Sequence, residues 1–257
     1  MSTLTYALVT LAYWAFMLTD GALRMIVLLH FHKLGYSPVR LAFLFLLYEC
    51  AGIVTNLLGG WIGSRYGLRK TLYAGLSLQV IALLSLTLID LSWAEYITVA
   101  FVMGLQALSG VAKDLTKMSS KSAVKLIVPS GNEGTLFKWV AALTGSKNAL
   151  KGIGFFLGSL LLTWLGFNNA LYTLAALILV VLISSIFVVK GTFGQSKKKS
   201  KITQIFSKSE AINRLSFARA FLFASRDVWF VVGLPIFLHD TLQWSFWQVG
   251  TFMATWV

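Results

Sequence analysis

Charged side chains are scarce in this sequence of 257 residues, since Asp, Glu, Lys and Arg together make up only 12%. A soluble domain of this length needs more polar surface than that to stay dissolved. Cysteine is rarer still, and the single Cys50 excludes an internal disulfide or a metal site built from several cysteines. Acidic residues number only nine against 22 basic ones, so the chain carries a formal net charge of +13.

Long apolar runs fill most of the chain, which is 57% hydrophobic with a mean hydropathy of +0.77. Runs of about 20 residues are long enough to cross a bilayer core. Backbone polar groups in lipid must be satisfied within their own segment, which requires helices. We therefore predict an all-α polytopic membrane protein. The predicted helices span residues 6–31, 38–62, 71–89, 94 to beyond 110, a fifth that ends near 165, 170–189 and 215–238, and an eighth opens near 246.

This pattern predicts three segments. Residues 1–190 form a six-helix transmembrane bundle, 191–214 a lysine-rich cytoplasmic linker, and 215–257 the start of a second bundle. The layout is typical of transporters built from two repeated bundles. A short repeat supports it, because Leu34-Gly35-Tyr36-Ser37 follows the first helix and Leu242-Gln243-Trp244-Ser245 follows the seventh. The last apolar segment is about half as long as a crossing requires, so we expect a chain truncated at its C-terminus.

Basic residues gather in alternate loops. Arg65, Arg69 and Lys70 follow the second helix, five lysines lie between the fourth and fifth, and the linker is basic, whereas the opposite loops carry few charges. The positive-inside rule then predicts a cytoplasmic N-terminus. Most of the net charge is explained in this way, with some attraction to anionic lipid and no nucleic-acid partner.

The loop after the second helix reads Gly60-Trp61-Ile62-Gly63-Ser64-Arg65-Tyr66-Gly67-Leu68-Arg69-Lys70-Thr71-Leu72 and resembles the signature loop of the major facilitator superfamily. Its glycines permit a tight turn and its arginines anchor the cytoplasmic end. It departs from the pattern at Ser64, where an aspartate is usual, and at Leu68, where a basic residue is usual. We predict a gating loop formed by Gly60, Arg65, Gly67 and Arg69. A plain basic turn between two membrane helices remains the alternative.

Ionisable residues inside apolar helices are expensive, and so they are functional candidates. Asp20 and Arg24 share one face of the first helix, Glu49 lies in the second, and Arg226 occupies a place in the seventh comparable to that of Arg24. Guanidinium groups bind oxyanions through two N–H donors, so Arg24 and Arg226 are predicted to bind substrate. Asp20 or Glu49 is predicted to carry a coupling proton. The alternative is that these charges neutralise one another as structural pairs.

Lysines recur on the fourth and fifth helices. We predict that Lys113, Lys117, Lys147 and Lys151 line the inner half of a cavity, while Lys121 and Lys125 lie on a solvated face. After Lys151, the Gly-x-x-x-Gly spacing of Gly154 and Gly158 predicts close packing against another helix. A cavity with this many cations suits a multiply charged anion taken from the cytosol.

Several stretches resemble one branch of the superfamily, the organoarsenical efflux permeases. They are Ala12-Tyr13-Trp14, Phe16-Met17-Leu18-Thr19-Asp20-Gly21-Ala22-Leu23-Arg24, Gln106-Ala107-Leu108-Ser109-Gly110, Ala112-Lys113-Asp114-Leu115-Thr116-Lys117-Met118, Leu143-Thr144-Gly145-Ser146-Lys147-Asn148-Ala149-Leu150-Lys151-Gly152 and Arg226-Asp227-Val228-Trp229-Phe230-Val231-Val232-Gly233-Leu234-Pro235. The resemblance implies export of arsenophosphoglycerate from a bacterial cytoplasm across the inner membrane, and hence arsenate resistance. In that scheme a glyceraldehyde-3-phosphate dehydrogenase makes the substrate from arsenate. The lone cysteine argues against recognition of thiol-seeking trivalent arsenic. We expect a monomer without cofactor or metal.

Two other functions stay open. An exporter of another organic anion or of a drug would have an apolar, aromatic-lined cavity, and a non-transporting membrane partner protein is a second alternative. An enzyme is not expected, because the sequence shows no nucleophile–base pair, metal-ligand cluster or phosphate-binding glycine loop. His30, His32 and His239 fall near the outer surface and are given no role.

Overall fold

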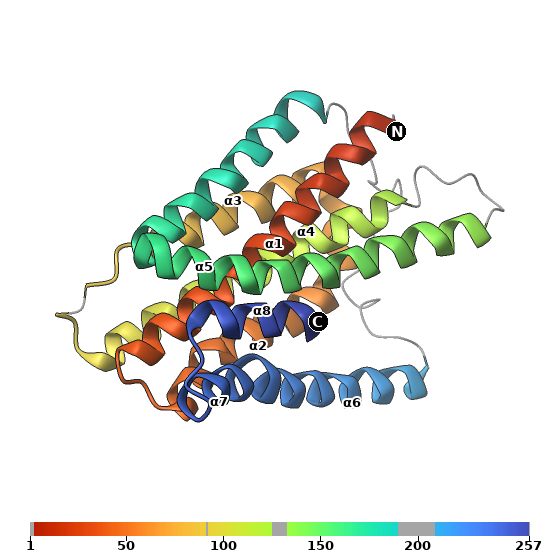
Figure 1. Ribbon diagram of the computed structural model, residues 1–257. Coiled ribbons are helices and arrows are strands. Elements are labelled where there is room, and N and C mark those ends of the chain that lie inside the picture. Colours follow the sequence, from red (N-terminus) through yellow and green to blue (C-terminus); the bar gives the residue numbers. More distant parts are fainter. Residues whose placement is uncertain (1–2, 91, 125–132, 190–208, 257) are drawn as a thin grey trace.

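Figure 1 shows the computed structural model of the chain, which describes residues 3–90, 92–124, 133–189 and 209–256. The described residues form helices and no strands, so the predicted all-α fold is confirmed. By length and composition, four helices can cross a membrane: α1, α2, α4 and α5. The elements in chain order are α1 (Thr3–Lys33), α2 (Pro38–Tyr66), α3 (Leu68–Leu86), α4 (Glu95–Val124), α5 (Glu133–Val188), α6 (Glu210–Asp227), the π-helical η2 (Val228–Gly233), α7 (Leu234–Asp240) and α8 (Phe246–Trp256).

The predicted fifth and sixth helices are both present, within the stretch labelled α5, and they meet at Gly166, where the chain reverses direction. That residue has φ 75° and ψ 179°, and the backbone on either side of it is helical. The second half of α5 therefore runs back along the bundle beside α3 (Figure 1). The hydroxyl of Tyr73 on α3 fixes this half by donating to the carbonyl oxygens of Ser185 at 2.8 Å and Val189 at 3.1 Å.

The first helix runs through the middle of the molecule and packs closely against α5. Glycines make the approach possible, because a Cβ on Gly21 would lie 2.5 Å from the carbonyl oxygen of Lys151. A Cβ on Gly154 or Gly158 would likewise overlap the backbone of α1. The close packing predicted from the Gly-x-x-x-Gly spacing is confirmed, and its partner is α1. This contact brings Lys151 to the same level of the bundle as Gly21.

The predicted helix over 215–238 is wrong in two respects. It begins earlier, as α6, where Glu210 pairs with Arg214 at 2.6 Å across one helical turn. It is also interrupted by the π-helical turn η2, just before Pro235 in the first turn of α7. Proline has no N–H to donate to the preceding turn and its ring crowds the carbonyl there, so the ladder shifts its register. Of the predicted linker at 191–214, residues 191–208 lie outside the described residues, whereas 210–214 belong to α6 and are helical.

Two turns at the same end of the bundle repeat a backbone conformation. Gly35, between α1 and α2, has φ 89°, and Gln243, between α7 and α8, has φ 56°. Each occupies the second position of the four-residue repeat found in the sequence. The serine two residues later begins the next helix: Ser37 caps α2, and the Ser245 N–H donates to Gln248 at 2.8 Å before α8. The repeat is therefore present in the backbone as well as in the sequence.

Candidate functional site

A cluster of charged side chains lies near the midpoints of the long helices. Asp20 and Arg24 on α1 have exposures of only 1% and 2%, which is rare for ionisable residues unless they are paired. Arg24 donates to Glu49 on α2, with 2.5 Å between the guanidinium nitrogen and the carboxylate oxygen. This ion pair places a predicted substrate-binding residue against a predicted proton carrier.

Tyr48 is the centre of this cluster, and sequence reasoning missed it. Its hydroxyl donates to Asp20, and the guanidinium carbon of Arg24 lies 4.1 Å from the centroid of its ring. The ammonium of Lys113 on α4 lies at the same distance, 4.1 Å. A buried ring face attracts cations by about 2 kcal/mol or more when water is excluded. A tyrosine directly before the membrane acid Glu49 was the one available signal.

The approach of α4 to Tyr48 depends on Gly110. A Cβ on Gly110 would lie 2.6 Å from the carbonyl oxygen of Tyr48, so a larger residue would separate the two helices. Lys113 follows three residues later on the same face of α4 and reaches the ring. Gly110 thus positions the cation without touching it.

A second ion pair lies one turn further along α4. Lys117 donates to Asp114 at 2.8 Å and to the side-chain oxygen of Asn56 at 2.9 Å. Asp114 is buried, and its second oxygen, Oδ2, has no hydrogen-bond partner among the described residues. Sequence reasoning predicted Lys117 but gave no role to Asp114, although an acid three residues before Lys117 was visible in the motif.

The first half of α5 contributes Lys147 and Lys151, both half-buried. Lys151 lies 5.6 Å from the ring centroid of Phe155. Lys147 forms no ion pair with a described side chain, and its electrostatic neighbours are Lys113, Lys117, Lys121 and Asp20. The structure therefore brings the four predicted lysines of α4 and α5 to one region facing α1.

Positive charge exceeds negative charge in this cluster. Five cationic side chains face three carboxylates, a formal excess of two. Like charges repel strongly in a partly desolvated site, so an anion that enters the region is favoured. The members are Arg24, Lys113, Lys117, Lys147 and Lys151, with Asp20, Glu49 and Asp114.

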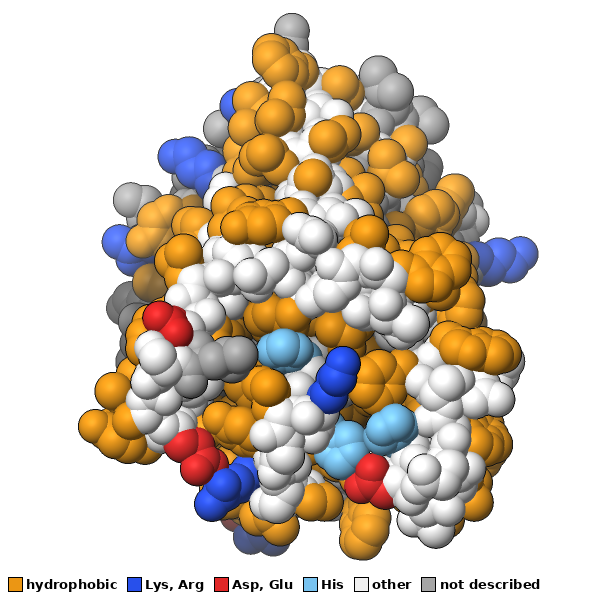
Figure 2. Space-filling model, turned by 60° about the vertical axis from the view of Figure 1, so that its left-hand side comes forward, with side chains coloured by type: hydrophobic (Ala, Val, Ile, Leu, Met, Phe, Trp, Pro, Cys, Tyr) orange, Lys and Arg blue, Asp and Glu red, His pale blue; other side chains and the backbone are white. Residues whose placement is uncertain are grey.

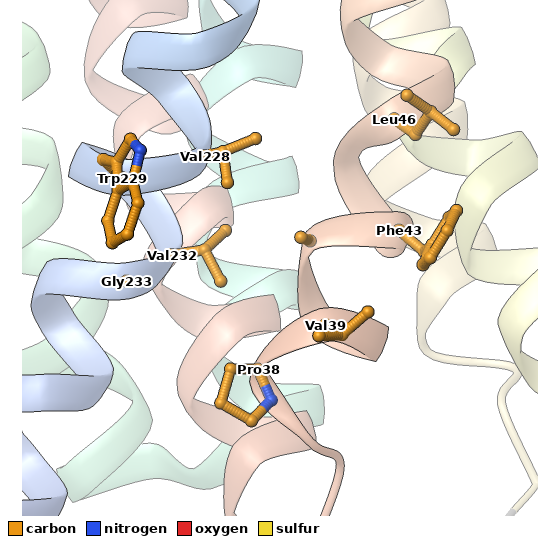
Figure 3. A pocket seen from close by; sticks show the side chains of 9 residues that line it. Pro38, Val39, Phe43, Leu46, Val228, Trp229, Val232 and Gly233 are labelled. Atoms are coloured by element: carbon orange, nitrogen blue, oxygen red, sulfur yellow. The ribbon is translucent and has the colours of Figure 1, made fainter.

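Two neighbouring pockets lie where α2 meets η2, and the smaller one adjoins the cluster. A small one of about 70 Å³ is lined by Arg24 and Glu49 together with apolar residues of α2 and η2. A larger one of about 420 Å³ is apolar and includes Phe43 and Trp229 in its lining. Figure 3 shows Val228 and Val232 projecting from η2 toward α2 across this pocket. The ion pair therefore borders an apolar space.

The predicted gating residues lie elsewhere, at the turn between α2 and α3. Gly67 has φ 84° and separates the two helices. The guanidinium of Arg65 lies 5.3 Å from the ring of Trp61, and that of Arg69 lies 5.4 Å from the ring of Tyr73. The turn itself holds Arg65, Gly67 and Arg69, whereas Gly60 lies earlier, inside α2. None of the four is part of the midpoint cluster.

Two predicted residues are described only in part or not at all. Arg226 falls in the last turn of α6, and its side chain lies outside the described residues, as does Lys125. Lys121, predicted to be solvated, is half-buried beside Lys147. The predicted solvated face at Lys121 stays a prediction, since a partly buried lysine can still extend its ammonium to water.

Comparison with known proteins agrees with the fold. A bacterial homologue of the human drug peptide transporters PepT1 and PepT2 superposes with a TM-score of 0.59 at 16% identity, covering 88% of this chain and 50% of that one. A D-xylose–proton symporter gives 0.58 at 14% identity, with 98% and 63% covered. A peptide transporter solved with sulfate gives 0.54 at 17% identity, with 96% and 48% covered.

The chain thus spans between 48 and 63% of the length of these solved structures. No curated protein matches its sequence. The sequence profile described as Major Facilitator Superfamily matches residues 9–257. Since this profile covers nearly the whole chain and the long helices are apolar enough to cross a bilayer, this multi-pass membrane protein belongs to the major facilitator superfamily.

Proposed function

We propose that this chain transports an organic anion with more than one oxyanion group out of the cytoplasm. The anion binds between α1, α4 and α5, and rocking of the two bundles exposes the site to each side of the membrane in turn. The N-terminus lies in the cytoplasm, which agrees with Arg65 and Arg69 at one end of the bundle and Glu95 and Asp240 at the other.

One observation carries the proposal. The half-buried ammonium of Lys147 has three lysines among its electrostatic neighbours and no ion-pair partner among the described residues. Concentrating like charges in a partly desolvated place is unfavourable by itself. An anion that binds there offsets the repulsion between the lysines, and this gain in free energy strengthens the binding of the substrate.

For the substrate itself we propose arsenophosphoglycerate, supplied by a glyceraldehyde-3-phosphate dehydrogenase. The sequence resemblance to organoarsenical efflux permeases supports this choice, and so do the two oxyanion ends of that molecule. The lysines of α4 and α5 suit one end, while Arg24 suits the other, because guanidinium binds oxyanions through two donors. Cys50 is exposed on α2 and is not in the cluster, which agrees with a substrate that does not need a thiol.

Proton coupling is proposed at Glu49. In its charged form Glu49 holds Arg24 at 2.5 Å, so it competes with the substrate for the guanidinium. A proton on Glu49 would remove its charge and weaken its attraction for Arg24, which favours binding of the anion. Asp20 is a second candidate, because its partner is the hydroxyl of Tyr48. A multiply charged anion that leaves with one proton still carries negative charge, and the inside-negative membrane potential favours its exit by about 2.3 kcal/mol per net charge for each 100 mV.

The apolar pocket favours a second candidate, an exporter of an apolar drug. Its lining includes Phe43 and Trp229, and its volume of about 420 Å³ falls in the range of small-molecule sites. In this case the lysines would serve the structure alone. Trp229→Ala would then reduce transport, while Lys147→Ala would leave it unchanged.

The deciding experiment measures intracellular arsenic in arsenate-exposed bacteria that lack their own arsenic efflux. Cells express the chain with and without the dehydrogenase, and Lys147→Ala is compared with Lys138→Ala, an exposed lysine on the same helix. We expect arsenic to fall only when both proteins are present, and to stay high with Lys147→Ala but not with Lys138→Ala.

Unchanged arsenic, with membrane expression confirmed, would overturn the arsenical substrate. Extrusion of a lipophilic dye that depends on Trp229 would then favour the drug exporter. Failure to move either compound would favour a non-transporting membrane partner.

A further inference from the structure

Three metal-ligating side chains meet where the end of α1 contacts the end of α7. His32 lies in the last turn of α1, and His239 and Asp240 lie in the last turn of α7. One ligand atom from each lies within 4.8 Å of the other two. Figure 2 looks onto this end of the molecule, where histidine side chains gather beside an acidic one. None of the three residues takes part in the midpoint cluster.

A hydrogen bond fixes which ring nitrogen of His239 can bind a metal ion. Its Nδ1 lies 2.7 Å from the carbonyl oxygen of Trp244, and a carbonyl can only accept. Nδ1 therefore carries the proton, which leaves the lone pair on Nε2. A ring nitrogen held in this way by a backbone carbonyl is the usual arrangement of metal-bound histidines. The ring also packs against Phe246, with 4.8 Å between centroids, so its orientation is fixed.

His32 supplies a second ligand already in contact with the third. Its Nε2 lies 2.7 Å from Oδ1 of Asp240, close enough to share one proton with it. Its Nδ1 is buried and has no hydrogen-bond partner among the described residues. A cation that replaced the shared proton would be bound by His32 and Asp240 together, with His239 adjacent at a ring separation of 5.5 Å.

Two imidazoles and one carboxylate are the ligands of Zn²⁺ sites that keep a fourth position for water. Asp240 has 51% of its side chain exposed, so an ion can enter from solvent and water can complete its coordination. Calcium and magnesium prefer oxygen ligands and are poorly matched to two imidazoles.

We propose that His32, His239 and Asp240 form a Zn²⁺ site that holds the end of α1 against the end of α7. In a transporter that opens at this end, the bound ion keeps the end closed and so inhibits transport. The inhibition rests on the proposed function, whereas the binding of the ion does not.

Direct binding tests the site. Zn²⁺ is titrated into the purified full chain by calorimetry, with Cys50→Ser in every variant because the exposed thiol could bind the ion independently. We expect one ion per chain and at least tenfold weaker binding in His32→Ala, His239→Ala and Asp240→Asn. His30→Ala is the matched control, since His30 lies on the same turn of α1 but stacks on Phe167 at 4.0 Å and should bind normally. Equal affinity in His239→Ala and the control would overturn the site.

The closing effect has its own measurement, which needs no substrate. Spin labels are attached at Leu34→Cys and Leu242→Cys, two exposed positions that flank the site. Zn²⁺ should narrow the distance distribution between them, and the narrowing should be absent with His239→Ala. If Zn²⁺ binds but the distance distribution does not narrow, the ion does not hold the two helix ends together, although the binding site itself stands. If arsenical transport is absent altogether, the proposed function fails and the two zinc experiments still decide the metal site.

Discussion

Arg24 on α1 and Lys113 on α4 hold their cationic groups at the same distance, 4.1 Å, from the ring of Tyr48. A single aromatic ring on α2 therefore ties the charges of two neighbouring helices to one place. Because the hydroxyl of the same residue binds Asp20, the ring and the hydroxyl of Tyr48 make separable contributions.

Substitutions of Tyr48 separate them. Tyr48→Phe keeps the ring and removes the hydrogen bond to Asp20, which should destabilise the fold by about 1–3 kcal/mol. Tyr48→Leu also removes the cation–π contacts, so it should unfold at a lower temperature still. We expect the substrate concentration for half-maximal transport to change little in Tyr48→Phe and to rise about tenfold, or by roughly 1.4 kcal/mol, in Tyr48→Leu. Equal transport by the two variants would show that the ring does not position the cations.

Removing Glu49 tests the buried ion pair. Glu49→Gln removes the negative charge that faces the guanidinium of Arg24 and should lower the free energy of unfolding by about 1–3 kcal/mol, since Glu49 is partly exposed. The double variant Arg24→Gln/Glu49→Gln should recover part of that loss. Thermal unfolding in detergent measures both. If transport in Glu49→Gln kept the pH dependence of the parent, the proposed proton role of Glu49 would be wrong.

Lys147→Ala should change stability and affinity in opposite directions. Its removal relieves repulsion with Lys113, Lys117 and Lys121, so the free energy of unfolding should rise by up to about 1 kcal/mol. Loss of a cation from the binding region should weaken anion binding about tenfold or more, or by at least roughly 1.4 kcal/mol. Lys138→Ala, with its exposed side chain, should do neither. A loss of both stability and affinity would indicate a structural lysine instead.

The packing of α1 against α5 can be tested with two glycines of α5. Gly158→Ala places a methyl group against the backbone of Ala22 and should destabilise the protein by about 1–3 kcal/mol. Gly145→Ala meets nothing within 4 Å and should stabilise the helix by about 0.5–1 kcal/mol. Opposite shifts in unfolding temperature are expected. Similar shifts in both variants would contradict the close approach.

The sequence predicts the helices well because each long apolar run must form one in lipid. Helix ends are harder, as α2 shows by continuing to Tyr66 instead of ending near residue 62. Outside the bilayer core, polar and apolar residues can both be helical, so hydropathy does not show where a helix ends there. The interruption at η2 was also not predicted, although Pro235 marked its position.

The lysines of the site were predicted, while two of its central residues were not. Charge inside an apolar run is visible in a single sequence, which is why Lys147 and Arg24 were identified. The role of Tyr48 depends instead on the rotation of α2 relative to α1 and α4. That rotation is set by backbone contacts at glycines such as Gly110, and partners that lie 28 and 65 residues away in the chain leave no local pattern.

Gln243 adopts φ 56° at the place where the first half of the chain has Gly35. A left-handed backbone is free of strain for glycine but costs a residue with a Cβ about 1 kcal/mol. The second half thus keeps the torsion of the first even where its side chain opposes it. Two turns that share a backbone torsion but not a residue type can therefore reveal a repeat that a comparison of amino acids alone would miss.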